Sequence, residues 1–441
     1  MKSLLFVYLL TYGGAAAALL NPLVGLYIYI LFAILKPESL WSFSVPLGGH
    51  YSRIVAIAML IGWAWQGFGN WNLRGCRAIV AALAGYWFWQ LLSACFSPNP
   101  DRAWADVDGT TKILLPFLVA VTTIDSVQKL RQLVWVMLFG FGFVAYEMNL
   151  SYLQGYNRIQ LGTLGGLDNN GMALLMAGGA ALGLCYGLGE KIWWRKWLAF
   201  GASAAMAHAV LLSFSRGGML ALLVSGALIF LLIPKRPAHW LVLALAVLMT
   251  LRLAGPEVRQ RFFTAFEERE QLDASAANRL DYWKIGWELM MREPLLGVGA
   301  GAFRMAATEH SPEKASPYTG LVQEAHSTWF QVGAELGVPA LLCLMSFFGL
   351  GIWQGVVLAR RRGAADDFLQ TVGQAGAAGI TAFCAAATFL TAYGIEGPFY
   401  ATLLVAVASR LANVLGEHTP GGYVGLGSQT NDLAGQWRAA P

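Results

Sequence analysis

Three ionisable side chains lie at the borders of long apolar segments, where membrane proteins rarely place a charge. Arg216 separates two apolar runs, Arg279 lies on an aromatic-rich stretch of the one long polar loop, and His326 opens the next apolar run. A charge near hydrocarbon is costly unless it reaches the interface, pairs or lines a wet cavity. Guanidinium groups bind two phosphate oxygens with their planar fork, and an imidazole can take a proton from a hydroxyl near neutral pH. These residue types raise the hypothesis of a diphosphate-linked lipid substrate with His326 as the general base.

Each of these residues also has a plainer interpretation. Arg216 at a helix end could extend its charge to the interface, which is inexpensive for a long side chain. A single histidine at the start of an apolar segment is more often an ordinary interfacial residue. Arg158, in a polar loop ahead of another apolar run, has the same two interpretations on weaker grounds, because its loop is longer. Position alone leaves the functional and the topological explanations open.

The composition places the chain in a membrane. Hydrophobic residues make up 57% of the 441 residues, charged residues only 12%, and the mean hydropathy is +0.53. Soluble domains carry about twice that charged fraction. Continuous apolar runs of roughly 17–25 residues, the length that crosses a bilayer as a helix, recur along the chain, and they lack the alternation of β-barrel strands. The sequence therefore predicts an all-α, polytopic integral membrane protein.

The apolar runs predict about twelve transmembrane helices. Residues 22–35 are too few to cross alone, so we expect them to form one kinked or re-entrant unit with the preceding run, around Asn21 and Pro22. The apolar segments are 3–20, 22–35, 52–68, 77–97, 111–124, 132–149, 171–189, 197–214, 217–233, 238–254, 329–358, 371–392 and 397–415.

Basic residues set the expected orientation. Under strict alternation, five basic clusters fall on one side, which the positive-inside rule assigns to the cytoplasm. The net charge of +5 is small for this length. The basic residues therefore indicate membrane orientation better than nucleic-acid binding. We expect N-terminal helices over 1–255, a large periplasmic loop over 256–325, C-terminal helices over 326–416, and a flexible cytoplasmic tail over 417–441. The clusters are Arg74 and Arg77, Lys129 and Arg131, Lys191 to Lys196, Lys235 and Arg236, and Arg360 to Arg362.

The large loop contains a predicted helix over 275–293, with Ser275 as its N-cap and Pro294 just past its end. Arg279, Trp283 and Trp287 share one face of that helix. Tryptophan favours the membrane–water interface, so the helix is expected to lie on the bilayer surface. That position would hold Arg279 at the depth of lipid phosphates.

Two other motifs in the loop do not support further chemistry. The run from Gly297 to Gly301 resembles a phosphate-binding loop, but no strand precedes it and no Gly-Lys-Ser follows, so a tight turn is the better interpretation. His310 and Glu313 have helical spacing, but Pro312 intervenes and no third ligand is evident. We expect no metal and no cofactor, and the five cysteines are interpreted as packing residues.

Four stretches together resemble the bacterial O-antigen ligase and O-antigen polymerase superfamily. The N-terminal third is also similar to exosortase-associated O-glycosylation ligases. One difference is Ser327, where the superfamily commonly has asparagine after the histidine. The stretches, in chain order, are NRIQLGTLGGLDNNGMALLM, SFSRGGMLAL, NRLDYWKIGWELMMREPLLGVGAGAF and AHSTWFQVGAELGVPALL.

This resemblance implies a GT-C-like glycosyltransferase of the bacterial inner membrane, with its active site facing the periplasm. Such enzymes move a glycan from undecaprenyl diphosphate to an acceptor without a divalent metal. Arg216 and Arg279 match the superfamily's paired arginines, Arg158 its upstream arginine, and His326 its proposed general base. A single displacement would invert the anomeric carbon.

The acceptor is left open by the sequence. The first hypothesis is an O-antigen ligase that uses lipid A–core oligosaccharide; a protein O-oligosaccharyltransferase or an O-antigen polymerase is the alternative. A lipid or sugar transporter is a rival from another class. A transporter would typically show repeats between its halves and ionisable residues near the middle of the membrane, and neither is evident here.

Overall fold

The computed structural model describes residues 2–161, 164–235, 274–361 and 367–417, with the isolated positions 240, 244 and 248. Its regular elements are helices, and the only bridge between described residues outside them joins Leu164 and Leu167. The elements are α1 (Lys2–Tyr8), η1 (Leu9–Gly13), α2 (Gly14–Leu20), α3 (Pro22–Leu35), α4 (Pro37–Leu40), α5 (Tyr51–Trp65), α6 (Arg77–Ala94), α7 (Pro100–Thr123), α8 (Val127–Leu153), α9 (Asn169–Gly189), α10 (Trp193–Leu212), α11 (Arg216–Leu232), α14 (Ala274–Arg292), α15 (Phe303–His310), η3 (Pro312–Lys314), α16 (Thr328–Arg360), α17 (Asp367–Ala387) and α18 (Glu396–Glu417).

The predicted apolar segments correspond to helices wherever the structure describes them. The segment 238–254 and the tail after residue 417 lie outside the described residues, apart from three isolated positions. Within the described part of the chain, five helical stretches are long and apolar enough to cross a membrane. The prediction of an all-α membrane protein is thereby supported, and the number of twelve crossings stays a prediction. The five stretches are Lys2–Leu20, Pro22–Leu40, Val127–Leu153, Asn169–Gly189 and Thr328–Arg360.

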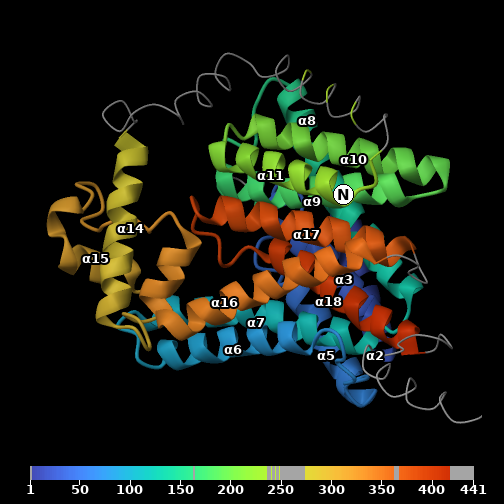
Figure 1. Cartoon of the computed structure of the whole chain (residues 1–441), viewed down its shortest axis with the longest axis horizontal. Helices are drawn as coiled ribbons and strands as arrows, with labels where there is room; N and C mark the ends of the chain where they lie inside the picture. The colour runs from blue at the N-terminus through green and yellow to red at the C-terminus, as the bar shows by residue number, and fades with distance from the viewer. Residues whose placement is uncertain are drawn as a thin grey trace, which may run out of the picture.

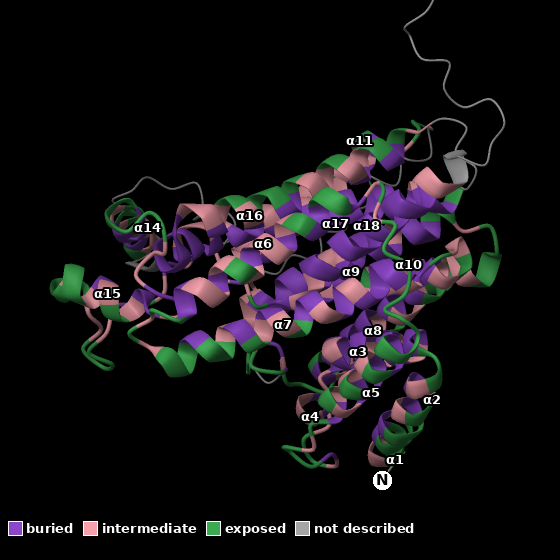
Figure 2. Cartoon of the chain, turned by 90° about the horizontal axis from the view of Figure 1, so that it is seen from below, coloured by how far each residue is buried: buried purple, intermediate pink, exposed green. Residues whose placement is uncertain are grey.

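Helix α9 lies in the middle of the bundle and is the most buried of these five stretches (Figure 2). It packs against α8, α10, α11 and α17. Its glycines permit close approach: a Cβ at Gly183 would lie 3.0 Å from the carbonyl oxygen of Ala199 on α10. Small residues at helix contacts are how membrane helices pack tightly, because lipid offers no hydrophobic drive for association. The central helix thus holds its neighbours through backbone proximity.

Several of the predicted basic clusters gather at one end of the bundle, which we call the basic end. Arg131 lies 3.9 Å from Glu190 and its guanidinium covers the ring of Phe368 at 4.4 Å. Lys191 pairs with Asp367 at 3.1 Å. These contacts join α8 and the start of α17 to the α9–α10 turn. The common side of all five clusters stays a prediction.

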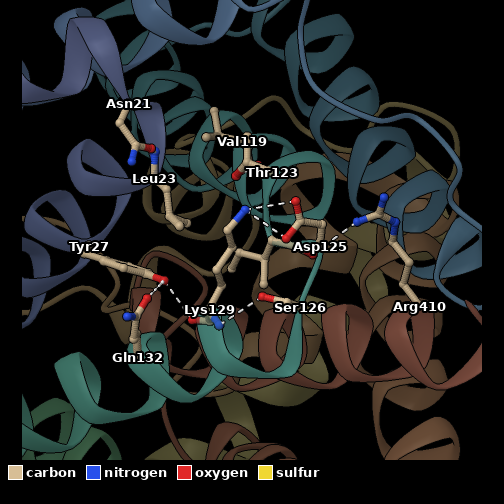
Figure 3. Close-up of polar contacts among 11 residues, drawn as sticks. Asn21, Leu23, Tyr27, Val119, Thr123, Asp125, Ser126, Lys129, Gln132 and Arg410 are labelled. Atoms are coloured by element: carbon tan, nitrogen blue, oxygen red, sulfur yellow. Dashed lines mark hydrogen bonds and ion pairs between the residues drawn. The ribbon is translucent and has the colours of Figure 1, made fainter. Parts of the chain in front are cut away.

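A buried arginine that sequence reasoning overlooked also holds the basic end together (Figure 3). Arg410 on α18 is only 3% exposed, and it donates to the carbonyl oxygens of Asn72 (2.8 Å), Ile124 (3.2 Å) and Asn70 (3.3 Å). Nearby, Tyr27 donates to the carbonyl oxygen of Lys129 at 2.7 Å. A buried guanidinium is tolerated because these carbonyls replace its lost water.

The opposite end carries α14, α15 and the segment 294–327, and we call it the site end (Figure 1). Helix α14 stands across the end of α16, as an interfacial helix would. It ends at Arg292 with Pro294 beyond, as predicted, but Ala274 is already helical, so the expectation that Ser275 is the N-cap is wrong. Local capping patterns define a helix boundary only to within one or two residues.

A small core fixes α14 to this end. Its buried face packs on α15 and on the segment before α16, while Trp287 on the other face is 52% exposed. An apolar inner face with an exposed tryptophan fits a helix that rests in the headgroup region. The core residues are Tyr282, Ile285, Leu289, Phe303, Ala307, Val322, Ala325 and Ala334.

Cysteine labelling tests whether the two ends face different compartments. Tyr318 at the site end is 96% exposed, and the side chain of Lys191 at the basic end is 83% exposed. In a background without the native cysteines, of which Cys95 is exposed, we expect an impermeant maleimide to label Tyr318→Cys from the periplasm. Lys191→Cys should react only after the inner membrane is permeabilised. Labelling of both positions from the same side would contradict the predicted topology.

Candidate active site

The first part of the site is the turn between α10 and α11. Phe214 adopts a left-handed conformation (φ 52°), and Ser215 then caps α11 by accepting the Gly218 N–H at 3.1 Å. Arg216 is the first residue of α11 and is half-buried. The sharp turn and the cap therefore place Arg216 at the start of α11.

The loop that contains Arg158 supports this turn. One asparagine side chain of the loop and two at the start of α9 bond to the turn, so the NRIQ and DNN motifs hold Arg216 in place indirectly. Amides suit this task because each offers both a donor and an acceptor. The bonds run from Asn157 Nδ2 to the Leu212 carbonyl (2.7 Å), from Asn169 Nδ2 to the Ser213 carbonyl (2.9 Å), and from Ser215 Oγ to Asn170 Oδ1 (2.7 Å).

Arg158 itself is directed at the end of α4. Its Nη2 donates to the carbonyl oxygens of Ser39 at 3.1 Å and Leu40 at 2.8 Å. A cation at the carboxyl end of a helix satisfies carbonyls that have no partner within the helix. The structure thus gives Arg158 a structural role that the sequence did not predict, beside its proposed role with the donor.

His326 lies immediately before α16 in a strained backbone conformation. Its φ of 49° is in the left-handed region, its side chain is half-buried, and its Nε2 lies 3.2 Å from Gln323 Oε1. The ring faces that of Tyr282 on α14, with centroids 6.3 Å apart. A left-handed histidine persists only where its surroundings fix it, and such strain is concentrated at functional sites.

Electrostatics shows which charges surround His326. Burial lowers its pKa below the ordinary histidine value, the Arg279 guanidinium lowers it further, and the Asp168 carboxylate acts in the opposite direction. Arg279 on α14 and Asp168 at the start of α9 therefore both lie within electrostatic reach of the imidazole. Of the predicted site residues, the structure gives Arg279 an electrostatic effect on His326, and it adds Asp168.

Glu324 is a second candidate base that lies close to the histidine. Burial raises its pKa, the nearby Arg102 and Arg304 lower it, and Asp106 and Asp168 raise it. A carboxyl with a raised pKa is a stronger base than an ordinary glutamate.

Arg102 and Arg304 extend the polar cluster and were missed by sequence reasoning. Arg102 lies 3.3 Å from Asp106, and the Tyr393 hydroxyl donates to the same carboxylate at 3.2 Å. Arg304 Nε donates to the carbonyl oxygen of Val322 at 3.2 Å. No local sequence signal marks these residues, because they come from α7, α15 and the segment before α18.

The glycine-rich segment 297–301 forms a tight turn, as predicted. Gly297 has φ 65°, and a Cβ there would lie 2.4 Å from the backbone of Glu335. The turn packs where α16 is interrupted at Gly337 (φ 80°, ψ 175°). Glycine is needed because backbone meets backbone at this point. The segment positions the site and does not resemble a phosphate cradle.

His310 pairs with a different carboxylate from the one the sequence suggested. Its Nε2 lies 2.8 Å from Glu288 Oε2 on α14. Among the described residues, no group of three or more histidine, cysteine, aspartate or glutamate side chains is placed to hold a metal ion. The pair therefore joins α15 to α14 and has no third ligand in the described part of the chain.

A groove of about 820 Å³ lies between α1, α3, α8 and the segment that follows α4. Its walls are mainly apolar, and Lys2 and Ser44 contribute polar atoms. Trp41 lines it one residue after Leu40, whose carbonyl accepts from Arg158.

Fold and site define a membrane-embedded helical protein whose polar cluster is covered by interfacial helices at one end. Residues 201–345 match the family model described as O-antigen ligase. This match supports the assignment of the segment to the O-antigen ligase/polymerase family, and with it a glycosyltransferase-like ligase or polymerase activity. The matched segment includes Arg216, Arg279 and His326 but neither Arg158 nor Asp168. No curated protein matches the chain.

Proposed function

We propose that this protein is an O-antigen ligase of the bacterial inner membrane with a GT-C-like architecture. It transfers a glycan from undecaprenyl diphosphate to a hydroxyl of lipid A–core oligosaccharide at the periplasmic face. The observation that carries the proposal is the half-buried His326, held in a left-handed conformation with its ring 6.3 Å from that of Tyr282 on α14, the helix that also carries Arg279. An imidazole can take the proton of a hydroxyl, and a guanidinium can offset the charge of a diphosphate without a metal.

The reaction is a single displacement. His326 takes the proton of the acceptor hydroxyl, and that oxygen attacks the anomeric carbon as the bond to the diphosphate oxygen breaks. The leaving undecaprenyl diphosphate gains negative charge, which Arg216, Arg279 and Arg158 offset with charge-assisted hydrogen bonds. Attack opposite the leaving group inverts the configuration at the anomeric carbon.

The lowered pKa of His326 suits this role. A general base must be unprotonated, and burial together with the Arg279 charge favours the neutral imidazole. The diphosphate of a bound donor brings negative charge into the same region. The guanidinium of Arg279 can offset that charge and also favour the neutral form of the imidazole. The groove beside Arg158 supports an amphiphilic donor, because it offers an apolar surface next to a cation.

Two other acceptors are compatible with the same chemistry. A hydroxyl of a protein would make the chain a protein O-oligosaccharyltransferase, and a second lipid-linked glycan would make it an O-antigen polymerase. A lipid or sugar transporter is the remaining alternative, and it would not need a base beside the arginines. The family match favours the transferases over the transporter.

One assay separates these alternatives. Purified protein is incubated with undecaprenyl-diphosphate glycan and, separately, with rough lipopolysaccharide, a protein acceptor or a second lipid-linked glycan, in excess EDTA and without nucleotide. We expect glycosylated lipopolysaccharide with inverted anomeric configuration. Product on another acceptor only would change the assignment within the class. Activity that needs added Mg²⁺ or Mn²⁺ would contradict the arginine-based mechanism.

A further inference from the structure

Two buried polar side chains of α16 connect the parts of the candidate site. Gln331 and Glu335 are one helical turn apart and are 2% and 4% exposed. Gln331 Nε2 donates to Glu335 Oε1 at 2.7 Å. Buried polar groups cost free energy unless they are hydrogen-bonded, so this pair has a definite set of partners. One of those partners is the main chain of Ala325, the residue before His326.

Gln331 holds the backbone on both sides of His326. Its side-chain Oε1 accepts the N–H of Ala325 at 2.8 Å, and its main-chain N–H makes the first helical bond of α16, to the carbonyl oxygen of Ser327 at 3.0 Å. Ala325 and Ser327 are both fully buried. The left-handed conformation of His326 lies between these two fixed points, which offset its cost.

Glu335 connects the same unit to the rest of the site end. Its Oε1 also accepts the N–H of Phe303 at 3.2 Å, at the start of α15. Its carbonyl oxygen accepts the N–H of Gly299 and the hydroxyl of Ser93, each at 3.1 Å. The carboxylate and backbone of one residue thus join α6, the glycine turn and α15 to the helix that supports His326.

We infer that Gln331 and Glu335 are positioning residues that fix the direction of the His326 imidazole relative to Arg279. Neither residue touches the substrate; they act through the backbone of residues 325–327. The inference rests on the proposed function, since it assigns these residues a part in the same proton transfer. Its test has a readout that does not depend on activity.

The central variant is Gln331→Met, which keeps the length of the side chain and removes its two side-chain hydrogen bonds, to Ala325 and Glu335. Gln354→Met, on the same helix 23 positions further along, is the matched control. The buried Ala325 N–H loses its acceptor in Gln331→Met, so we expect kcat to fall about 10- to 100-fold. Donor KM should change little. Gln354→Met should behave as wild type in both constants.

A second readout follows the histidine directly. Diethyl pyrocarbonate modifies accessible imidazoles, and peptide mass spectrometry gives the rate at each histidine. In Gln331→Met, residues 325–327 lose the hydrogen bond that holds them, so the modification rate of His326 should rise. The modification rate of His310 should stay unchanged. Gln354→Met should leave both rates unchanged.

A rescue experiment separates positioning from simple packing. Gln331→Glu alone places two carboxylates in contact and should lose kcat, although it keeps an acceptor for Ala325. The double variant Gln331→Glu/Glu335→Gln restores an amide–carboxylate pair with the partners exchanged. We expect it to recover most of the lost kcat and to return the His326 modification rate to that of wild type.

Wild-type kcat and an unchanged His326 modification rate in Gln331→Met would overturn the inference. The inference would also be overturned by a kcat that falls only in proportion to the loss of folded protein, as measured by thermal melting, and that the double variant does not restore. If the wild-type protein transfers no glycan, the proposed function fails, and the His326 modification rates still decide whether Gln331 positions this residue.

Discussion

Replacement of His326 is expected to abolish glycan transfer while donor binding is retained. A general base typically contributes about 10²- to 10⁴-fold to a rate, and a neutral imidazole contributes little to holding a diphosphate. Since His326 has φ 49°, His326→Asn is the better variant beside His326→Ala, because asparagine tolerates the left-handed region. The measurement is single-turnover transfer at saturating donor, with donor affinity determined separately.

Two neighbouring residues provide controls for this experiment. His310→Ala removes a histidine at the same end whose partner is Glu288, and its rate should equal that of wild type. Glu324→Gln removes the alternative base, and it should retain most of the activity. Substantial turnover in His326→Asn together with a loss in Glu324→Gln would assign the proton transfer to Glu324.

Replacement of the arginines is expected to reduce both donor binding and turnover. In the proposed mechanism, Arg216→Ala and Arg279→Ala each remove a charge that contacts the diphosphate in the ground state and gains importance as the leaving group departs. Removal of one preorganised donor of this kind costs about 10²- to 10³-fold in rate. The lysine variants should restore activity only in part, because an ammonium keeps the charge and loses the planar fork.

Arg292 supplies the matched control for Arg279. It lies on the same helix α14 and is exposed, so Arg292→Ala should leave donor affinity and rate as in wild type. Equal losses in Arg292→Ala and Arg279→Ala would indicate a general effect of charge on lipid binding. Full activity in Arg279→Lys would show that the fork is not used.

Helix positions were predictable because apolar length is a local signal. The segments around α8, α9 and α16 could be located from hydropathy, and α14 from the spacing of Arg279, Trp283 and Trp287. The start of α14 was missed, since Ser275 resembles a cap but lies inside the helix. A cap is defined by backbone conformation, which residue type indicates only statistically.

The candidate site was predictable only in part. Counting apolar segments predicts that Arg216, Arg279 and His326 face one end. The structure adds that the charge of Arg279 lowers the pKa of His326. The contacts of Arg158 with Ser39 and Leu40 join residues 118 and 119 positions apart. No local pattern encodes such contacts, because they arise when helices distant in sequence pack together.

The polar cluster around Glu324 illustrates the same limit. Arg102 and Arg304 are ordinary basic residues within polar stretches of the sequence. Only the packing of α7 and α15 against the segment before α16 brings them to the carboxylate. The kink of α16 at Gly337 likewise depends on contact with Leu295, whose carbonyl oxygen would lie 2.4 Å from a Cβ there.

The acid limb of the pH profile of kcat/KM tests the central claim most directly. This constant reports the pKa of the free enzyme, before the charge of the donor acts on His326. Neutral imidazole is the active form, so activity falls as pH drops through the His326 pKa, which lies below the ordinary value of about 6.5. Arg279→Gln removes a charge that lowers this pKa, so the limb should move to higher pH, whereas Arg292→Gln should leave it in place. An acid limb that stays unchanged in Arg279→Gln, or that persists in His326→Asn, would contradict the assignment of His326 as the base.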